Sequence, residues 1–347
     1  MADFHLECPL LLPAETVQMA HGGGGRVMRQ LIESLLVPAF ANQALDARHD
    51  AALLDLDGVR LAFTTDTFVV TPRTFPGGDI GELAVYGTVN DLACGGAQPR
   101  FLSCALLLEE GLPLAELASQ VASMQRAAAR CGVAIVTGDT KVVDRGRGDG
   151  LYINTAGIGL VPQGRQVGPR QVRPGDAILV SGDLGRHGVA VLSVREGLAF
   201  EAPVQSDCAP IHHLCEALWA ADIDVHCLRD PTRGGLGAVL NEIALDSSLA
   251  VEVRERDIPI AAAVAAVCEL LGLDPLHVAC EGRLVAFVPG AQAEAALAAL
   301  RRLPEGAGAA IIGQVLERAP VPVTLRTRLG TDRILDLPTG EQLPRIC

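Results

Sequence analysis

Two kinds of apolar run alternate along both halves of this 347-residue chain, and this alternation is the strongest constraint on its fold. Short runs of strand length stand between longer stretches whose apolar residues recur at helical spacing. Such an order predicts two α/β or α+β domains, because each sheet must cover an apolar face with helices. We place the domains at 1–165 and 166–337, joined near 164–174, with a flexible tail at 338–347.

The expected elements follow from these runs. In the first half we expect helical spacing over 27–36, strands at 51–56, 59–64, 101–108, 133–136 and 151–161, and helices at 80–92 and 113–132. In the second half we expect strands at 177–180, 250–253, 284–288 and 310–315, and helices at 189–197, 211–221, 236–245, 261–271 and 292–303. One apolar strand in each half ends in Gly-Asp (138–139 and 182–183), which is weak evidence for a repeated architecture.

The composition excludes several classes of partner. The net charge is −13 and no basic patch is visible, so nucleic-acid binding is not expected. No apolar run reaches the ~18 residues of a transmembrane helix, so no membrane span is expected. The first residues carry no basic signal-peptide region. The ten cysteines are therefore expected to be mostly reduced core thiols of a cytoplasmic protein.

Four aspartates in the first half stand at the ends of apolar elements, which suggests a cation site. They are Asp50, Asp66, Asp91 and Asp139. Magnesium prefers oxygen ligands and is usually held by a few carboxylates together with phosphate oxygens. Carboxylates gathered at strand ends could hold metal ions that bridge ATP. Taken singly, each aspartate is more often a helix cap or turn residue.

A glycine run offers amide donors for phosphates. Residues 21–26 read HGGGGR, and backbone N–H groups in such a loop can wrap an anion. The run is not a Walker A loop, because no Gly-Lys-Ser/Thr follows. Taken alone, a glycine run is more often a plain flexible linker.

Lys141 is the only lysine in the chain, although Lys and Arg together number 28. A lone lysine suggests a place where a compact ammonium is needed and a forked guanidinium fails. Lys141 lies two residues beyond Asp139, so it would stand beside a transferring phosphate or a developing negative oxygen. Glu281 lies at the mouth of an expected strand, and spacing alone does not separate a functional acid from a solvated one.

Other cysteines and histidines give a weaker signal. Cys208, His212, His213 and Cys215 are close in sequence but do not match a common zinc spacing. They fit one amphipathic helix, so a metal site there is the less favoured interpretation.

The tail gives the sharpest feature. The sequence ends Leu343-Pro344-Arg345-Ile346-Cys347, and Pro344 disfavours a helix. The segment 338–347 spans up to ~33 Å when extended, enough to swing between an internal site and a partner's surface. An exposed thiol is liable to oxidation, which favours a functional role over chance. We therefore expect an ATP-using enzyme that acts on its own Cys347.

Several longer motifs make the interpretation specific. Across nearly the whole chain the sequence resembles the HypE family of hydrogenase maturation proteins, which are carbamoyl dehydratases. The resemblance is carried by HGGGG (21–25), TTDTFVVTP (64–72), FPGGDIGELAVYGTVNDLA (75–93), VTGDTKVV (136–143), INTAGIG (153–159), RDPTRGGL (229–236), EGRL (281–284) and PRIC (344–347).

This resemblance implies a two-domain fold like that of aminoimidazole ribotide synthetase, with the N-terminal sheets pairing across a homodimer and ATP bound near the interface. It implies that the carbamoyltransferase HypF places a carbamoyl group on the terminal cysteine. ATP then drives dehydration of the thiocarboxamide to a thiocyanate, and the HypC–HypD complex takes the cyanide for the iron of nickel–iron hydrogenase.

The resemblance also implies roles for single residues. Cys347 is the carrier thiol, Glu281 is a candidate base and Lys141 stabilises negative charge on the amide oxygen or phosphate. The nucleotide-binding set is Gly23, Gly24, Asp66, Thr67, Asp91 and Asp139. The Mg2+ set is Asp50, Asp66, Asp91, Asp139 and Asp230. One departure is Cys280, where the family pattern suggests Asn, and it affects the expected orientation of Glu281.

Two alternatives remain. A different enzyme of the same superfamily, such as selenophosphate synthetase or thiamine monophosphate kinase, would use a small free substrate and would not need Cys347. A non-catalytic scaffold would use the tail only to dock a partner. Loss of water from a carbamoyl adduct on Cys347 would separate the enzyme from the scaffold.

Overall fold

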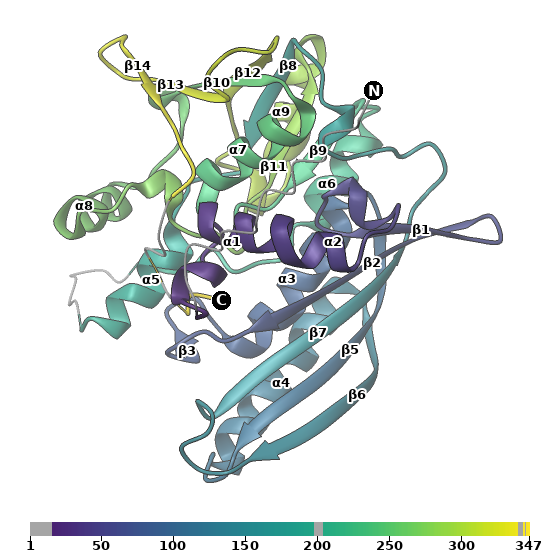
Figure 1. Ribbon diagram of the computed structural model, residues 1–347, viewed down its shortest axis with the longest axis vertical. Helices are drawn as coiled ribbons and strands as arrows, with labels where there is room; N and C mark the ends of the chain where they lie inside the picture. Colours follow the sequence, from purple (N-terminus) through teal and green to yellow (C-terminus); the bar gives the residue numbers. More distant parts are fainter. Residues whose placement is uncertain (1–15, 198–203, 339–342, 344) are drawn as a thin grey trace, which may run out of the picture.

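The first half of the chain forms a five-stranded sheet, called the N-terminal sheet below, at the lower right of Figure 1. The computed structural model describes residues 16–197, 204–338, 343 and 345–347. The strands are β1 (Ala52–Leu56), β2 (Val59–Phe68), β5 (Gln98–Glu109), β6 (Ala134–Val143) and β7 (Leu151–Leu160). Their order is β1-β2-β7-β5-β6. The β5–β6 pair is parallel and the other neighbours are antiparallel.

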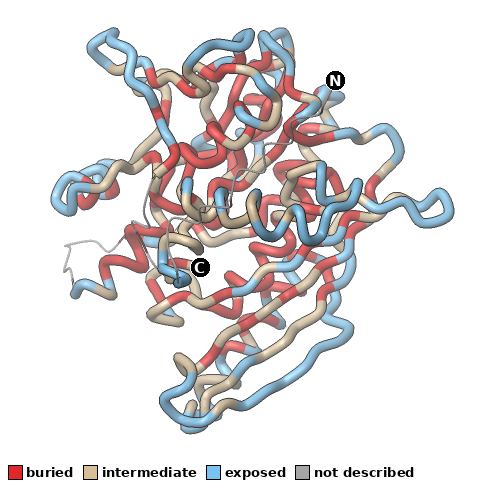
Figure 2. Tube along the Cα trace, viewed as in Figure 1, coloured by how far each residue is buried: buried red, intermediate tan, exposed pale blue. Residues whose placement is uncertain are grey.

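Helices cover one face of the N-terminal sheet. These are α3 (Ile80–Cys94) and α4 (Leu114–Cys131), and α4 is the crossover that the parallel β5–β6 pair requires. Successive side chains of a strand point to opposite faces. On β2, Ala62 and Phe68 are buried under the helices while Phe63 is exposed on the outer face. The edge strand β6 is pale blue along nearly its whole length in Figure 2, because its side chains are exposed.

The second half forms a seven-stranded sheet, called the C-terminal sheet, in the order β14-β13-β10-β12-β8-β11-β9. Its strands are β8 (Asp176–Val180), β9 (Cys227–Arg229), β10 (Ala250–Arg254), β11 (Val285–Pro289), β12 (Ala310–Leu316), β13 (Val323–Arg326) and β14 (Asp332–Ile334). The helices of this half are α5 (Arg186–Arg195), α6 (His212–Ala220), α7 (Gly235–Ser247), α8 (Ala262–Leu271) and α9 (Ala293–Arg301). α7 packs on one face through Leu236 and Leu240, whereas α6 and α9 pack on the other through Leu214 and Leu297.

Short elements complete the chain. The first of them are η1 (Met19–Gly22), α1 (Arg26–Leu31), the π-helical η2 (Ile32–Leu36), α2 (Val37–Ala39), η3 (Leu45–Ala47), β3 (Thr74–Phe75) and β4 (Gly78–Asp79). The remaining ones are η4 (Pro169–Gln171), η5 (Glu255–Asp257), η6 (Pro275–His277), η7 (Gly290–Gln292) and η8 (Pro304–Gly306). No described helix is both long and apolar enough to cross a bilayer.

All the longer helices and strands expected from the sequence are present, but two strand ends were predicted wrongly. β2 continues past Asp66 to Phe68, and β6 continues past Asp139 to Val143. The two Gly-Asp pairs therefore do not support a repeated architecture, because Gly138 lies within β6 while Gly182 follows β8. A Cβ on Gly138 would lie 2.1 Å from the carbonyl oxygen of Cys104. The glycine thus permits close strand approach and does not end the strand.

The glycine run is a packed turn and not the flexible linker that an isolated run suggests. Gly24 has a φ of +70°, and a Cβ there would lie 2.4 Å from the carbonyl oxygen of Arg233. A Cβ on Gly25 would lie 2.3 Å from the carbonyl oxygen of Pro338. Glycine is required at both positions, because the turn lies directly against the loop that follows β9 and against the C-terminal segment.

The boundary predicted at residues 165 and 166 falls between β7 and β8, so each sheet draws its strands from one half of the chain. The boundary itself stays a prediction.

The tail was expected to be flexible throughout, and residues 339–342 and 344 lie outside the described residues. Leu343 and Ile346 are buried, so the end of the tail is packed and this part of the expectation was wrong.

Candidate active site

A cavity of about 220 Å³ lies between β2, α3, α7 and the loop after β9. We call it the acidic cavity, because five carboxylates line it: four aspartates from separated parts of the sequence, and Glu242 of α7. Asp50 precedes β1, Asp66 lies on β2, Asp91 lies in the last turns of α3 and Asp230 follows β9. The carboxylates were expected at strand ends, but they come from a loop, a mid-strand position, a helix and a second loop.

Burial and mutual repulsion disfavour the ionised form of these carboxyl groups. The pKa of Asp91 is raised well above its usual range by burial and then by the charges of Asp230, Asp50 and Asp66. Burial raises the pKa of Asp230 to about 6. Thr64 donates a hydrogen bond to Asp91 Oδ2 at 2.9 Å. The cavity therefore holds more negative charge than its own residues neutralise.

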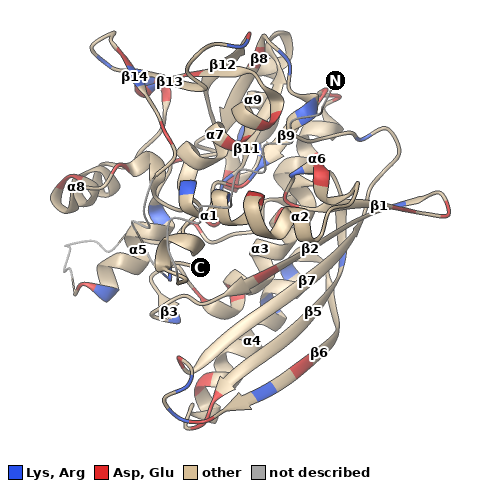
Figure 3. Cartoon of the chain, viewed as in Figure 1, with Lys and Arg blue, Asp and Glu red and all other residues tan. Residues whose placement is uncertain are grey.

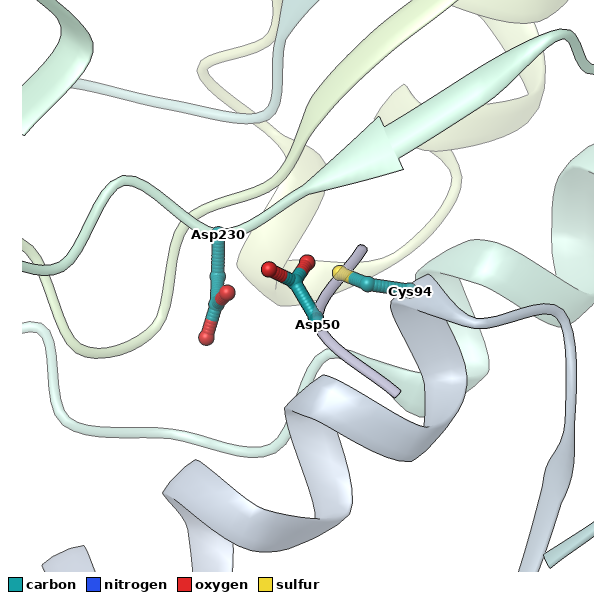
Figure 4. Close-up of side chains that lie close together, drawn as sticks. All are labelled: Asp50, Cys94 and Asp230. Atoms are coloured by element: carbon teal, nitrogen blue, oxygen red, sulfur yellow. The ribbon is translucent and has the colours of Figure 1, made fainter. Parts of the chain in front are cut away.

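Figure 4 shows the Asp50 carboxylate between Asp230 and the thiol of Cys94. Ligand atoms of Asp50, Asp230 and Cys94 all lie within 4.8 Å of one another. Asp50 Oδ1 forms an ion pair with Arg229 Nε at 2.9 Å, whereas Asp50 Oδ2 has no hydrogen-bond partner among the described residues. An unpartnered buried carboxylate oxygen beside other carboxylates suits a hard divalent cation. Cys94 is a poor ligand for such an ion, because burial raises the pKa of its thiol.

Within one chain, Cys347 lies near Arg233 and Asp66, which line this cavity. Burial raises the pKa of its thiol well above the usual range, and the charge of the nearby Glu281 carboxyl group raises it further. Glu281 is itself buried, and its pKa is raised well above normal by burial and by the charges of Asp230 and Asp66. Its Oε1 has no hydrogen-bond partner among the described residues. The structure thus brings together Cys347 and Glu281 as the sequence predicts.

Backbone contacts fix the position of Glu281. The N–H groups of Glu281 and Gly282 both donate to Asp207 Oδ2 at 3.2 Å. Cys280 is the residue that departs from the family pattern. Its N–H donates to the carbonyl oxygen of Pro231 at 2.9 Å, and the Cys280 Sγ accepts from the N–H of Gly185 at 3.1 Å. Cys280 is therefore a buried structural thiol, and the loop around Glu281 is held despite the departure.

Within one chain, three other predicted site residues lie away from Cys347 and Glu281. Thr67, Asp139 and Lys141 line a different cavity, of about 390 Å³, on the outer face of the N-terminal sheet. Lys141 Nζ pairs with Asp139 Oδ2 at 2.8 Å, and its side chain is 70% exposed. The adjoining red and blue segments of β6 in Figure 3 are these two residues. In one chain, Lys141 and Glu281 do not meet.

Strand register explains the separation. Asp139 pairs with Ala105, Ala105 with Asn154, and Asn154 with Thr67, so these residues form one row across β6, β5, β7 and β2. Three strand spacings of ~4.8 Å put Asp139 about 14 Å from Thr67 along that row. Asp66, the neighbour of Thr67, points to the opposite face.

Of the two glycines predicted to bind the nucleotide, one lines the acidic cavity. Gly24 lines the acidic cavity, while Gly23 precedes it in the turn that follows η1. Cys208, His212, His213 and Cys215, for which a metal site was the less favoured interpretation, do not all share one helix, because Cys208 precedes α6. His213 pairs with Glu305 at 2.9 Å. In the described part of the chain, three or more His, Cys or carboxylate ligand atoms gather only at Asp50, Cys94 and Asp230.

Arg233 is a central residue whose role spacing did not reveal. It lines the acidic cavity, and its pKa is raised chiefly by Cys347 and further by Asp66, Glu281 and Asp91. Its positive charge acts on both the thiol and the carboxylates, whereas Arg229 pairs directly with Asp50. The available signal was the motif RDPTRGGL, in which the arginine stands beside two glycines of positive φ.

The two halves of the chain match models of AIR synthase related proteins, the N-terminal domain over residues 48–161 and the C-terminal domain over 173–325. Thiamine monophosphate kinase from Aquifex aeolicus shares this fold, with a TM-score of 0.65 at 18% identity. The fold and the buried carboxylates thus define a member of the AIR synthase related class.

Much stronger matches lie within one branch of that class. Carbamoyl dehydratase HypE of Azotobacter vinelandii is 52% identical over 332 residues, which covers 96% of this chain and 97% of the relative. The Escherichia coli K12 protein of the same name is 50% identical, covering 95% and 99%. A crystal structure of HypE in complex with ATP has a TM-score of 0.81 at 49% identity, covering 96% and 100%. A HypE–HypF complex has a TM-score of 0.84 at 45% identity, covering 89% and 99%.

The chain belongs to the HypE family of hydrogenase maturation proteins. The resemblance noted in the sequence is thereby confirmed, as is the two-domain α/β fold.

Proposed function

We propose that this chain is an ATP-dependent carbamoyl dehydratase that converts a thiocarboxamide on Cys347 to a thiocyanate. The observation that carries the proposal is that the buried Cys347 thiol lies near Glu281 and near Arg233 and Asp66 of the acidic cavity. A carbamoyl group on that sulfur would lie beside a buried carboxyl group of raised pKa and beside Arg233. Cyanide for a nickel–iron hydrogenase is the product that the family implies.

ATP is the second substrate, by analogy with the relative whose structure contains it. Mg2+ fits the acidic cavity, because Asp50, Asp66, Asp91 and Asp230 supply oxygen ligands and an unpartnered Oδ2. The ion would neutralise phosphate charge. Gly24 allows the backbone to approach closely at the same cavity. Asp139 was also predicted to bind the nucleotide and the metal ion. Within one chain, however, it lies on the outer face of the N-terminal sheet.

The reaction needs a leaving group and a base. An amide oxygen leaves poorly, so the γ-phosphoryl group of ATP is transferred to it, giving ADP. Departure of that oxygen as phosphate and loss of both amide protons then form the nitrile. Glu281 is placed to accept a proton, and its raised pKa makes it a stronger base once ionised. Arg233 stabilises the negative charge that gathers between the thiol and the carboxylates.

A homodimer accounts for the uncovered face of the N-terminal sheet. The outer face carries exposed apolar side chains, among them Phe63, Phe101, Val136, Ile158 and Leu160. Sheets of this kind normally bury both faces or keep one face polar, and a contiguous apolar face marks an interaction site. Pairing with the same face of a second copy would cover these residues and agrees with the dimer that the family implies.

The dimer also reunites the predicted catalytic pair. Lys141 and Asp139 lie on the pairing face, where they are exposed in one chain. Stacked sheets lie ~10 Å apart, within the reach of two facing long side chains. In the described part of the chain β1 pairs with β2 only as far as Phe63, so residues 64–68 of β2 form an open sheet edge. Past this edge, Lys141 of one copy would reach the site that contains Glu281 of the other. The lone lysine would then stabilise phosphate or amide-oxygen charge across the interface.

Partners follow from the family. HypF is proposed as the donor of the carbamoyl group, because a relative forms a complex with HypF. The HypC–HypD complex is proposed as the acceptor of the cyanide. The nine described cysteines are free thiols, in keeping with the predicted cytoplasmic location.

Removal of the thiol tests the proposal. Cys347→Ala should abolish ATP hydrolysis that depends on HypF and carbamoyl donor, because no thiocarboxamide forms. A kinase of a small free substrate would keep its turnover, which would contradict the proposal. A scaffold would hydrolyse no ATP in either form.

A further inference from the structure

The end of the chain lies against the residues that follow β2 and against α5, which bond its main chain. We call this the tail groove, formed by Val69, Thr71, His187 and Arg195. The N–H of Val69 donates to the main-chain oxygen of Cys347 at 3.0 Å, and the N–H of Thr71 donates to the carbonyl oxygen of Arg345 at 3.2 Å. Both bonds come from residues that directly follow the end of β2. Between them the tail makes a turn, because Arg345 has a φ of +56°.

The α5 side of the groove bonds the same segment. His187 Nε2 lies 2.7 Å from the carbonyl oxygen of Ile346, and Arg195 Nη2 donates to the carbonyl oxygen of Arg345 at 2.7 Å. His187 is fully buried, and burial lowers its pKa, so the ring is neutral. Its Nδ1 meets Ser206 Oγ at 2.9 Å, which leaves Nε2–H as the donor to Ile346. Both edges of the tail backbone are thereby bonded.

Side chains of the tail fill sites of their own. Ile346 is 3% exposed and belongs to the same apolar cluster as Val189 and Val278. Arg345 forms an ion pair with Asp149 and donates to Thr71 Oγ1. The groove thus matches a basic residue, then a buried aliphatic residue, then the cysteine that meets Glu281.

We propose that the tail groove is a peptide-binding site that recognises an Arg-Ile-Cys sequence without needing it to be joined to the chain. The contacts that hold the tail are those of a bound peptide, and none requires covalent continuity. A tether raises the effective concentration of the tail to the mM range, so a free peptide would bind more weakly by that factor alone. The groove would also accept the tail of a second copy. Presentation of the bound cysteine to Glu281 rests on the proposed function.

A synthetic Leu-Pro-Arg-Ile-Cys peptide tests the site in the full chain. With its own thiol blocked, the peptide should displace the native tail at mM concentration and speed alkylation of Cys347, measured by peptide mass spectrometry. The peptide of reversed sequence is the control and should have no effect. Equal acceleration by both peptides, or none by either, would overturn the proposal.

Binding is measured directly with a variant that lacks residues 343–347 and a fluorescently labelled peptide. His187→Ala in that background should weaken binding about tenfold, because the carbonyl of Ile346 loses its buried donor. His187→Gln keeps an N–H donor and should restore most of the affinity, whereas His213→Ala, remote from the groove, should change nothing. Equal affinities for all three variants would contradict the assignment.

Activity distinguishes this inference from the function on which it rests. With ATP and Mg2+, the truncated variant should convert an S-carbamoyl form of the peptide to the thiocyanate. If the full chain converts carbamoylated Cys347 but the truncated variant never converts the peptide, presentation in trans is wrong and the function stands. If the full chain converts nothing, the proposed function fails, and binding of the labelled peptide alone tests the groove.

Discussion

Asp66 and Thr67 are adjacent on β2, yet their side chains serve opposite faces of the N-terminal sheet. Asp66 lines the acidic cavity, whereas Thr67 accepts a hydrogen bond from Asn154 at 2.9 Å on the outer face. The predicted site is therefore divided by the sheet itself. Glu281 and Cys347 lie on the Asp66 side, and Lys141 lies on the Thr67 side.

This division predicts complementation between two inactive variants. Lys141→Ala and Glu281→Gln should each be inactive alone. A mixed dimer has one site with both changes and one site with neither, so random mixing should restore about a quarter of wild-type activity. The measurement is thiocyanate formation by differently tagged, co-expressed variants. If both residues served one site from the same chain, the mixture would stay inactive.

Glu281 should control the pH dependence of dehydration. Its pKa is raised chiefly by burial, so the carboxyl group is protonated at low pH and the base form accumulates as the pH rises through that raised pKa. Activity should rise over the same range. Glu281→Gln should reduce the rate ~100-fold or more and remove this limb of the profile. Glu269→Gln on the exposed face of α8 is the control, and a profile unchanged in Glu281→Gln would exclude the base role.

Magnesium should stabilise the protein in a pH-dependent way. The pKa of Asp230 is raised from 3.8 to about 6, so the folded state binds more protons than the unfolded state between these values. The free energy of unfolding without metal therefore falls as pH rises through that window. Mg2+ relieves the repulsion, so at saturating ion it should raise Tm by roughly 5 °C at pH 7.5 and by less at pH 5.

Asp230→Asn supplies the comparison for that experiment. The substitution removes one of the repelling charges, so Tm without metal at pH 7.5 should not fall, while the response to Mg2+ should shrink. Differential scanning fluorimetry measures both quantities. A response to Mg2+ of equal size at both pH values, or one unaffected by Asp230→Asn, would show that the ion binds elsewhere.

The docked Cys347 thiol should react slowly. Its raised pKa keeps it protonated, and the thiolate is the reactive form. Alkylation by iodoacetamide at pH 8 should be at least ~10-fold slower than in urea. Ile346→Asp should speed the reaction in the folded protein, because a buried charge ejects the tail, whereas Ile346→Val should have little effect. Fast alkylation of the unmodified chain would place the thiol in solvent most of the time.

The sequence predicted the architecture well where periodicity was strong. The DG turn at 57–58 joins β1 to β2, and Pro113 and Gly132 bound α4 as expected. β13 and β14 were missed, because runs of three or four residues show too little alternation. β6 was ended too early, because Gly138 was taken as a strand end when it permits close packing.

The site was harder to predict, since its geometry depends on register. Because the strand was expected to end at Asp139, its alternation was not used to place Asp139 and Lys141 on one face. Which face they share depends on the pairing of β6 with β5. Arg233 shows no distinguishing spacing, and its position beside Cys347 arises only when the loop after β9 meets the tail. The family motifs therefore identified the candidate site residues, whereas only the three-dimensional fold shows which of them lie together.

The central claim is that the thiol of Cys347 carries the group that is dehydrated while docked beside Glu281. Intact mass spectrometry of the full chain, carbamoylated on Cys347 and then incubated with ATP and Mg2+, tests it most directly. The account predicts that the adduct loses the mass of one water, that tandem spectra place the loss on Cys347, and that Glu281→Gln prevents it. An adduct that persists unchanged under turnover conditions, or a loss that occurs without ATP, would contradict the account.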